Sequence, residues 1–465
     1  MRKLVPLLVL ITLSVATPQI TPETYRQRRA AVRAQLGPGE RIVLLTKAVA
    51  IRNGDVEYEF RPDSDFWYLT GFGEPDAALV LTGEDVRFSL GDRDYAGHEF
   101  LFIRKRDPAR ERRTGMRLGV ERAPEALLID QALPIDIFAD ALPYLMQRAD
   151  TIYVNLNRDE LERPLTALAE ATLQWVPKDR GIFGIAEAVQ RFRKRLKART
   201  RGIKPPNRKV AYKSTGEIIH PMRMHKSLEE LELLQQAVDI TGKGLVAAIQ
   251  RAQSGLYEYQ VQATIEYEFK DGGAQREGFP CIIASGPNAL ILHYSENSRQ
   301  LQPGELLLMD VGAEVDMYTA DITRTVPVNG SFSPAQRELY GYLLETQAAA
   351  AAALKPGITL NELNQVAKEV LKEKGYDQYF IHGLSHWLGM NVHDVGRKDT
   401  PAEPGMVLTI EPGIYIPVDD QTVPPPYRGI GMRLEDDFLV TEEGGVILSR
   451  NIPCTIEEIE SLMKQ

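Results

Sequence analysis

The chain has 465 residues, which at about 100–200 residues per domain predicts two or three domains. Hydrophobic residues make up 43% of it and charged residues 26%, a composition that excludes a collagen-like, low-complexity or disordered protein. Its 55 basic and 64 acidic residues leave a net charge of −9, which argues against a general nucleic-acid binder because phosphates need a basic surface. The two cysteines, Cys281 and Cys454, cannot form a disulfide framework or a cysteine metal cluster. Any metal would therefore be held by carboxylates and histidines.

The first sixteen residues are typical of a secretory signal. Arg2 and Lys3 precede an apolar run from Leu4 to Ala16 that ends in small residues, a pattern that predicts cleavage after Ala16. The run is shorter than the ~20 residues that a spanning helix needs, so we predict no stable membrane span. The alternative is a buried first element of the mature fold. We expect an exported protein, periplasmic or secreted.

Residues 17–202 are predicted to form an α/β N-terminal domain. Pro22 suits the first position of a helix that would run to Leu36 before a Gly-Pro-Gly turn. Short apolar runs separated by glycine, aspartate and proline predict strands, and two stretches that each follow a proline predict helices. The predicted strands are 42–45, 77–81 and 100–103, and the predicted helices are 135–142 and 165–175.

A basic segment marks the predicted boundary between two domains. Ten basic residues and no acidic one lie between Arg191 and Lys209. We favour the solvated face of a helix that leads into a linker over a nucleic-acid or membrane patch. Because Pro205-Pro206 follows this segment, we predict a linker at residues 203–217 and a second domain at 218–465.

The second domain is predicted to be α+β. Ser227 with Glu230, and Ser333 with Gln336, have the spacing of capping boxes and predict two helix starts, the second helix ending near residues 355–357. Segments rich in leucine, isoleucine and valine lie between and after these helices. Helices grouped against a largely antiparallel sheet would form an α+β domain.

Three histidines lie within twelve residues of this domain: His382, His386 and His393. Such a density indicates a functional site, although a single histidine would more often be structural.

Two aspartates lie on a predicted hairpin. If its turn is centred on Val315-Asp316, Asp310 and Asp321 oppose each other and share one face of the sheet. Two buried like charges are unfavourable unless a cation neutralises them or one is protonated. The alternative is a pair of solvated turn aspartates.

Glu411 and Glu435 repeat this pattern, because each follows or interrupts an apolar strand segment. Two aspartates, two glutamates and at least one histidine suit Mn²⁺, Co²⁺ or Zn²⁺. Five protein ligands exceed what one open catalytic ion usually takes, so two ions that share carboxylates fit better. The residues therefore predict metal-assisted hydrolysis but leave the substrate open.

The motifs in order along the chain resemble those of Xaa-Pro aminopeptidase (aminopeptidase P), in the pita-bread metallopeptidase family. The match covers nearly all of the chain after the signal, from Phe60-Arg-Pro-Asp-Ser-Asp-Phe-Trp-Tyr-Leu-Thr-Gly-Phe onward. The others are His293-Tyr-Ser-Glu-Asn, Met-Asp310-Val-Gly-Ala-Glu, Ala-Asp321-Ile-Thr-Arg, His382-Gly-Leu-Ser-His386-Trp-Leu-Gly-Met-Asn-Val-His393-Asp, Thr-Ile-Glu411-Pro-Gly-Ile-Tyr and Gly-Met-Arg433-Leu-Glu435-Asp-Asp.

The resemblance implies a creatinase-like N-terminal domain and a C-terminal pita-bread domain with a curved, mainly antiparallel sheet. It also implies two Mn²⁺ ions, with Co²⁺ or Zn²⁺ as alternatives. Asp321 and Glu435 would bridge them, Asp310 would bind one, and His386 with Glu411 would bind the other. Glu411 would also be the base for a bridging water.

The resemblance further implies how substrate is bound. His293 and His393 would bind it and steady the tetrahedral intermediate. His382 would shape a proline pocket, and Arg433 would support the site from behind the ligands. Substrates would be peptides with proline at the second position, and the chain would form a homodimer or homotetramer.

Two other functions remain as alternatives, and one residue departs from the family pattern. An Xaa-Pro dipeptidase (prolidase) is the first alternative. A non-catalytic binding module is the second, and the filled ligand positions argue against it. Arg113 stands where relatives often carry a tryptophan thought to approach a neighbouring subunit, so pocket details and subunit arrangement stay open.

Overall fold

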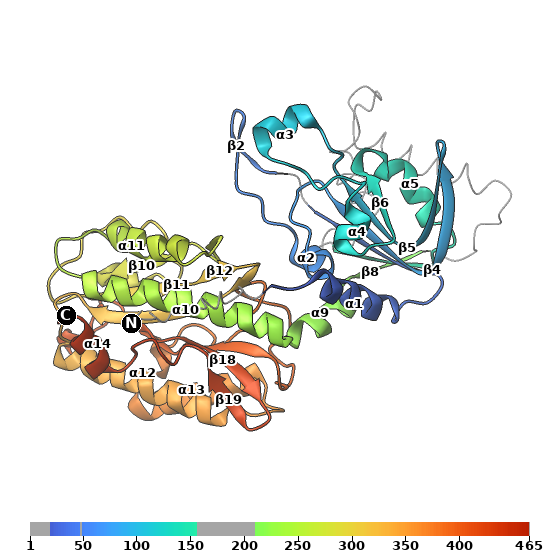
Figure 1. The fold of residues 1–465 in the computed structure, drawn as a ribbon. Coiled ribbons are helices and arrows are strands. Elements are labelled where there is room, and N and C mark those ends of the chain that lie inside the picture. The colour runs from blue at the N-terminus through green and yellow to red at the C-terminus, as the bar shows by residue number, and fades with distance from the viewer. Residues whose placement is uncertain (1–18, 47–48, 156–209, 465) are drawn as a thin grey trace, which may run out of the picture.

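The computed structural model describes residues 19–46, 49–155 and 210–464. Figure 1 shows two lobes that meet near helices α2 and α9. The proposed signal, the predicted helix at 165–175 and the basic segment at 191–209 lie outside the described residues and stay predictions.

A mixed six-stranded sheet forms the centre of the N-terminal domain. The strand order is β6-β5-β4-β1-β7-β8, in which β4 pairs antiparallel with β1 and β5, and the outer pairs are parallel. All three strands predicted in this domain are present. The bounds are β1 (Glu40–Leu45), β4 (Ala78–Leu90), β5 (Arg93–Ile103), β6 (Gln131–Pro134), β7 (Thr151–Val154) and β8 (Ala211–Ser214).

Helices cover both faces of this sheet because its central strands are apolar on both sides. Ile42 and Leu44 pack toward α1, α2 and α4, whereas Val43 and Leu45 pack toward α5. The bounds are α1 (Pro22–Arg33), α2 (Ser64–Thr70), α4 (Ala123–Leu127), the 3₁₀ helix η1 (Ile135–Ile137) and α5 (Phe138–Leu145). Helix α1 begins at Pro22 as predicted, with Thr21 as its cap, and ends at Arg33 rather than Leu36.

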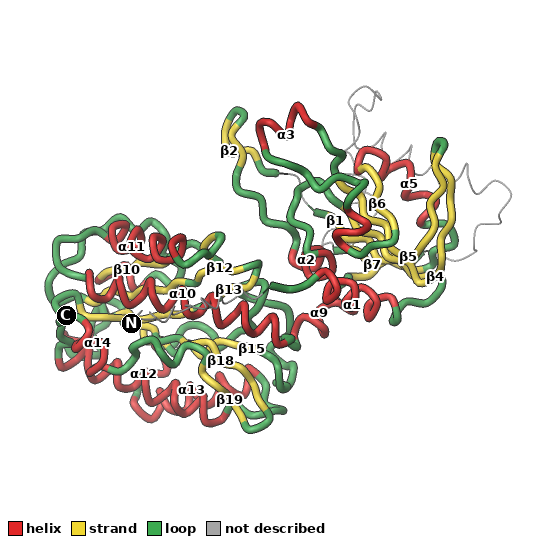
Figure 2. Tube along the Cα trace, in the orientation of Figure 1, coloured by secondary structure: helices red, strands yellow, loops and turns green. Residues whose placement is uncertain are grey.

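A small hairpin and a short helix project from this domain (Figures 1 and 2). The hairpin consists of β2 (Ile51–Asn53) and β3 (Val56–Glu57), and the helix is α3 (Pro108–Thr114). Arg113 lies exposed on α3.

The predicted linker at 203–217 is wrong for residues 211–214. These residues form β8, which pairs with β7 at the edge of the N-terminal sheet. An edge strand buries little of its surface, and these four residues are half-buried or exposed, so they lack the apolar run that predicts a strand. Helix α9 (Gly216–Met224) then leads into the C-terminal domain.

The C-terminal domain has two halves, each with a helix pair over antiparallel strands, which confirms the predicted α+β architecture. Helices α10 and α11 cover one half, and α12 and α13 cover the other (Figure 1). Both predicted capping boxes are present, at Ser227 with Glu230 and at Ser333 with Gln336. The helices are α10 (Leu228–Arg251), α11 (Glu258–Asp271), α12 (Pro334–Ala353), α13 (Leu360–Lys374) and α14 (Ile456–Leu462), with 3₁₀ turns η3 (Gly286–Leu290), η4 (Asp377–Tyr379) and η5 (Pro425–Tyr427).

The strands of this domain line its interior, and every named strand pair in its described residues is antiparallel. They form the sheets β10-β11-β14, β13-β12-β9, β15-β18-β19 and β16-β17. The bounds are β9 (Arg276–Glu277), β10 (Ile282–Ser285), β11 (Leu306–Val311), β12 (Ala313–Val315), β13 (Tyr318–Thr319), β14 (Ile322–Pro327), β15 (Val407–Ile410), β16 (Gly413–Tyr415), β17 (Gly431–Arg433), β18 (Asp436–Thr441) and β19 (Gly444–Ile447).

Across the described residues, no helix combines the length and apolar character needed to cross a lipid bilayer.

Candidate active site

The hairpin that carries the two aspartates differs from the predicted one in its register. Its turn is at Asp316 and Met317, both with positive φ, and Asp310 therefore lies opposite Thr323 rather than Asp321. Side chains alternate along a strand, so a displacement of two residues leaves Asp321 on the same face as Thr323. Both aspartates consequently face one side, although the predicted direct pairing was wrong.

Hydrogen bonds of the backbone bring the remaining acids and His386 to this face. Glu411 follows β15, and its N–H donates to the carbonyl of Leu384 at 2.9 Å, which ties it to the histidine segment. The N–H of Glu435 donates to the carbonyl of Thr323 at 3.1 Å, which ties it to the hairpin. The five predicted ligands thus come from separate segments that the sheets place side by side.

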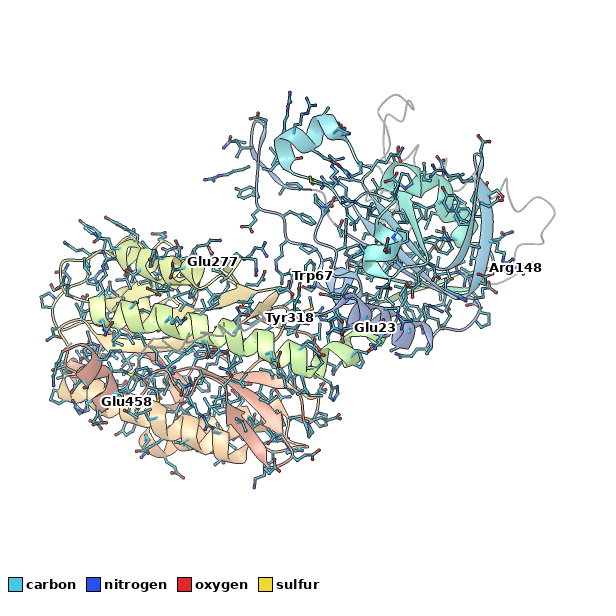
Figure 3. All side chains as sticks on the ribbon, in the orientation of Figure 1. Glu23, Trp67, Arg148, Glu277, Tyr318 and Glu458 are labelled. Carbon is cyan, nitrogen blue, oxygen red and sulfur yellow. The ribbon has the colours of Figure 1, made fainter. Side chains whose placement is uncertain are left out.

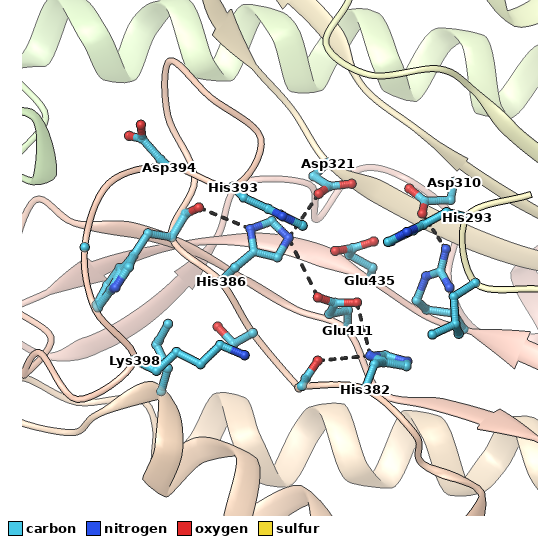
Figure 4. Close-up of a pocket in the computed structure, with 17 residues that line it drawn as sticks. His293, Asp310, Asp321, His382, His386, His393, Asp394, Lys398, Glu411 and Glu435 are labelled. Carbon is cyan, nitrogen blue, oxygen red and sulfur yellow. Dashed lines mark hydrogen bonds and ion pairs between the residues drawn. The ribbon is translucent and has the colours of Figure 1, made fainter. Parts of the chain in front are cut away.

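These five side chains line one cavity of about 390 Å³ (Figure 4). His386 Nε2 lies 3.2 Å from Asp321 Oδ2 and 3.7 Å from Glu411 Oε1. One ligand atom from each of Asp321, His386 and Glu435 lies within 4.8 Å of the others. All five predicted ligands therefore line this cavity: Asp310, Asp321, His386, Glu411 and Glu435.

These carboxylates are so close together and so deeply buried that ionising all of them at once is unfavourable. Burial and the neighbouring Asp310 raise the pKa of Asp321 well above its usual range, and burial with Asp321 does the same to the pKa of Glu435. Burial is also the main cause that raises the pKa of Glu411, to about 7. A bound cation would remove this penalty.

The donors fit a divalent metal centre. His386 Nδ1 donates to the carbonyl of Trp387 at 3.1 Å, which leaves the Nε2 lone pair directed at the carboxylates. The buried Oδ1 of Asp310 has no hydrogen-bond partner within the described residues, as expected for an oxygen reserved for a ligand. Carboxylate oxygens with one imidazole suit Mn²⁺, Co²⁺ or Zn²⁺.

The other predicted histidines lie in the same cavity. The rings of His393 and His386 are 4.3 Å apart, and His293 also lines the cavity (Figure 4). Burial, with the nearby charge of Arg433, lowers the pKa of His382 to about 4, so its ring is neutral. Consistent with this, its Nδ1 donates to the carbonyl of Gly383 and its Nε2 accepts from the hydroxyl of Tyr415, each at 3.0 Å.

Comparisons with known proteins identify the family. The sequence matches the models of "Metallopeptidase family M24" at residues 232–442 and of "Aminopeptidase P, N-terminal domain" at residues 25–153. Xaa-Pro aminopeptidase of Haemophilus influenzae is 36% identical over 96% of this chain and 98% of its own. The solved structure of Pseudomonas aeruginosa aminopeptidase PepP aligns with a TM-score of 0.83 at 36% identity, over 96% of this chain and 99% of that one. The chain belongs to the aminopeptidase P group of metallopeptidase family M24. It is a metallo-aminopeptidase with the expected pita-bread domain.

Arg433 lies behind two of the predicted ligands. Its guanidinium forms a short ion pair with Asp310 and donates to the hydroxyl of Tyr415 at 2.8 Å and to the hydroxyl of Thr323 at 3.1 Å. Thr323 in turn donates to Glu435 at 2.7 Å. The buried guanidinium of Arg433 thus orients Asp310 directly and Glu435 through Thr323.

Three residues at this site were missed by the sequence analysis. Thr323 could have been found, because a residue two positions after Asp321 on a strand shares its face. Tyr415 and Lys398 gave no such signal. Strand pairing with β17 brings Tyr415 to Arg433 and His382, and a loop brings Lys398 to the cavity. Arg113 lies elsewhere, in a separate cleft of about 550 Å³ on the N-terminal domain.

Metal binding is expected to stabilise the protein more at pH 8 than at pH 5. The pKa of Glu411 rises from 4.5 to about 7 in the metal-free fold, so the fold retains a proton that the unfolded chain has released in that window. As the pH rises from about 4.5 to about 7, the free energy of unfolding of the metal-free protein therefore falls, because Glu411 must ionise while buried. A bound metal ion neutralises the Glu411 carboxylate and restores this stability. The gain in Tm on adding Mn²⁺ to chelator-treated protein should be at least about 4 °C larger at pH 8. An equal gain at both values would contradict these ligands.

Proposed function

We propose that the protein removes the N-terminal residue from peptides with proline at the second position, using two divalent ions held by the five ligands, manganese by preference. The observation that supports this best is the convergence of those five donors on one cavity. When bound, the two ions would supply Lewis acidity toward the scissile carbonyl and a bridging hydroxide as nucleophile.

The surrounding side chains have matching chemistry. Glu411 would accept a proton from the attacking water, because a carboxylate next to the nucleophile can act as its general base. Burial and the neighbouring His386 lower the pKa of His393, so its neutral ring can hydrogen-bond to substrate. His293 and His393 would steady the tetrahedral intermediate, while Arg433 keeps Asp310 in place.

The preference for proline would arise because the site does not require an N–H donor on the bond that is cleaved. A bond to proline has no N–H, so a site that needs that donor fails on such substrates. The neutral His382 ring lines the cavity and would offer its surface to the pyrrolidine ring. Phe380 and Tyr415 pack against this ring at 5.0 Å and 5.4 Å, centroid to centroid, and fix its orientation.

A prolidase restricted to Xaa-Pro dipeptides is the alternative. Xaa-Pro dipeptidase of Pyrococcus furiosus is 39% identical, over 51% of this chain and 67% of its own. The Haemophilus relative matches 96% of this chain, N-terminal domain included, which favours the aminopeptidase.

Two peptides separate these functions. Protein starting at Thr17, loaded with Mn²⁺, should cleave Arg-Pro-Pro as well as Gly-Pro, and thorough chelation should abolish both activities. Cleavage of the dipeptide alone would identify a prolidase, and activity that survives chelation would overturn the metal mechanism.

We also propose that the protein is exported and assembles into a homo-oligomer, and two separate measurements test this. N-terminal sequencing of protein from its native host should find Thr17, and an intact Met1 would contradict the signal. Sedimentation should find a homodimer or homotetramer rather than a monomer.

A further inference from the structure

The loop at residues 388–396 carries His393 and lies between the cavity and the N-terminal domain. We call it the His393 loop. Its cavity side presents His393 and Asp394 (Figure 4). It contains no helix or strand. Backbone bonds to Val407 and Thr319 hold its first residues, Leu388 and Gly389, so contacts made by side chains matter most for the part that follows.

Arg61 and Ser64 of the N-terminal domain bind this loop directly. Arg61 donates to the carbonyl of Met390 at 2.5 Å, and the hydroxyl of Ser64 donates to the side-chain oxygen of Asn391 at 2.7 Å. Arg61 also donates to the Ser64 hydroxyl at 3.1 Å and forms an ion pair with Glu314 on β12 at 2.7 Å. One guanidinium therefore joins the N-terminal domain, the C-terminal sheet and the loop.

A second connection reaches the residue next to His393. Asp65 on α2 binds Arg223 on α9 at 2.7 Å, and the other guanidinium nitrogen of Arg223 binds Asp394 at 2.5 Å. Lys226 approaches the second oxygen of Asp394 at 3.4 Å. The Asp394 side chain is only 1% exposed, so its orientation depends on these partners rather than on water.

Close packing limits how the loop can adjust around Asp394. A Cβ atom at Gly389 would lie 2.2 Å from the Asp394 carboxylate, and one at Gly396 would lie 2.5 Å from the Trp387 ring. Gly396 also has a φ of +125°, which side chains rarely adopt. The loop is thus folded tightly against its anchor, and a shift at either end would move His393.

We infer that the N-terminal domain positions His393 for catalysis, with Arg61, Ser64 and Asp65 as positioning residues that act through the His393 loop. Figure 1 shows α2 and α9 at the junction of the lobes, and Figure 3 labels Trp67 of α2 and Tyr318 of β13 on either side of it. The role assigned to His393 rests on the proposed function. The domain would then contribute to turnover as well as to the shape of the molecule.

Arg61→Lys and Ser64→Ala test this inference, with Glu59→Gln as the matched control. Lysine keeps the charge beside Glu314 but cannot reach three acceptors at once. Glu59 also forms a contact between the domains, with Arg276 at 2.7 Å, and none of its described contacts reaches the His393 loop. We expect kcat on Arg-Pro-Pro to fall roughly 10- to 100-fold in Arg61→Lys, with KM changing less and bound metal unchanged. Glu59→Gln should stay within about twofold of wild type.

Hydrogen exchange supplies a readout that does not depend on activity. The amides of Gly389 and Asp394 are bonded to the carbonyls of Asn391 and Trp387, and they should exchange faster in Arg61→Lys and Ser64→Ala but not in Glu59→Gln. Unchanged exchange in both loop variants, or an equal loss of kcat in the control, would overturn the inference. If wild type failed to cleave Arg-Pro-Pro, the proposed function would fall, while the exchange comparison would still decide whether these contacts hold the loop.

Discussion

Replacing Asp321 by asparagine is expected to lower kcat/KM on Arg-Pro-Pro at least about 100-fold and to reduce the metal bound per chain. Loss of groups that merely support a ligand already costs about 10–100-fold, and Asp321 lies among the predicted ligands, 3.2 Å from His386 Nε2. The amide cannot carry the negative charge that a divalent ion requires. Steady-state kinetics and metal analysis on the purified variant measure both effects.

Asp316→Asn is the matched control for this experiment. It makes the same chemical change on the same hairpin, at a turn position with φ of 48° that asparagine tolerates. Its activity and metal content should match wild type. Full activity in Asp321→Asn, or an equal loss in Asp316→Asn, would contradict the assignment of Asp321 as a ligand.

Replacing Arg433 by methionine is expected to destabilise the protein by about 3–5 kcal/mol, because one partner of a buried ion pair disappears. Arg433 is 4% exposed and binds Asp310, Tyr415 and Thr323. Its loss removes the one described partner of the Asp310 carboxylate, whereas Tyr415 and Thr323 keep their bonds to His382 and Glu435. If the C-terminal domain (residues 218–465) unfolds as a unit, the change corresponds to a fall in its Tm of roughly 6–20 °C. Thermal unfolding in the presence of Mn²⁺ measures it.

Two further variants show whether the charge of Arg433 or the geometry of its donors is responsible for the loss of stability. Arg433→Lys should fall between wild type and Arg433→Met, since lysine keeps the charge but not the fork of donors. Arg397→Met removes an arginine whose side chain is 82% exposed and paired with Asp399, and it should cost no more than about 1 kcal/mol. Equal shifts in Arg433→Met and Arg397→Met would show that Arg433 does not hold the site together.

The hairpin shows how far sequence reasoning reached at the site. The apolar run before Asp310 and the alternation of strand residues were enough to place both aspartates on one face. The register was wrong because Asp316-Met317 does not resemble the asparagine- or glycine-containing pairs that usually form such turns. The residue opposite Asp310 differs from the predicted one by two positions. Because side chains alternate along a strand, a displacement of two positions keeps Asp321 on the predicted face of the sheet.

Strand β8 shows a limit of a different kind. Its four residues, Ala211–Ser214, have no strong apolar pattern, and only pairing with β7 makes them a strand. An edge strand gains its stability from a neighbour that lies far away in sequence. Local composition therefore indicated a linker.

The sequence by itself predicted a metal site built from carboxylates and imidazoles. Its lack of a cysteine cluster and its buried acids and clustered histidines limited the ligands to carboxylates and imidazoles, and the order of its motifs pointed to the family. Only the tertiary structure decided which groups support those ligands. Arg433 reaches Asp310 from a strand of a different sheet, Arg61 reaches the His393 loop across the domain junction, and Arg223 links Asp65 to that loop. Such contacts depend on distances of a few ångströms between residues far apart in the chain, and no local pattern records those distances.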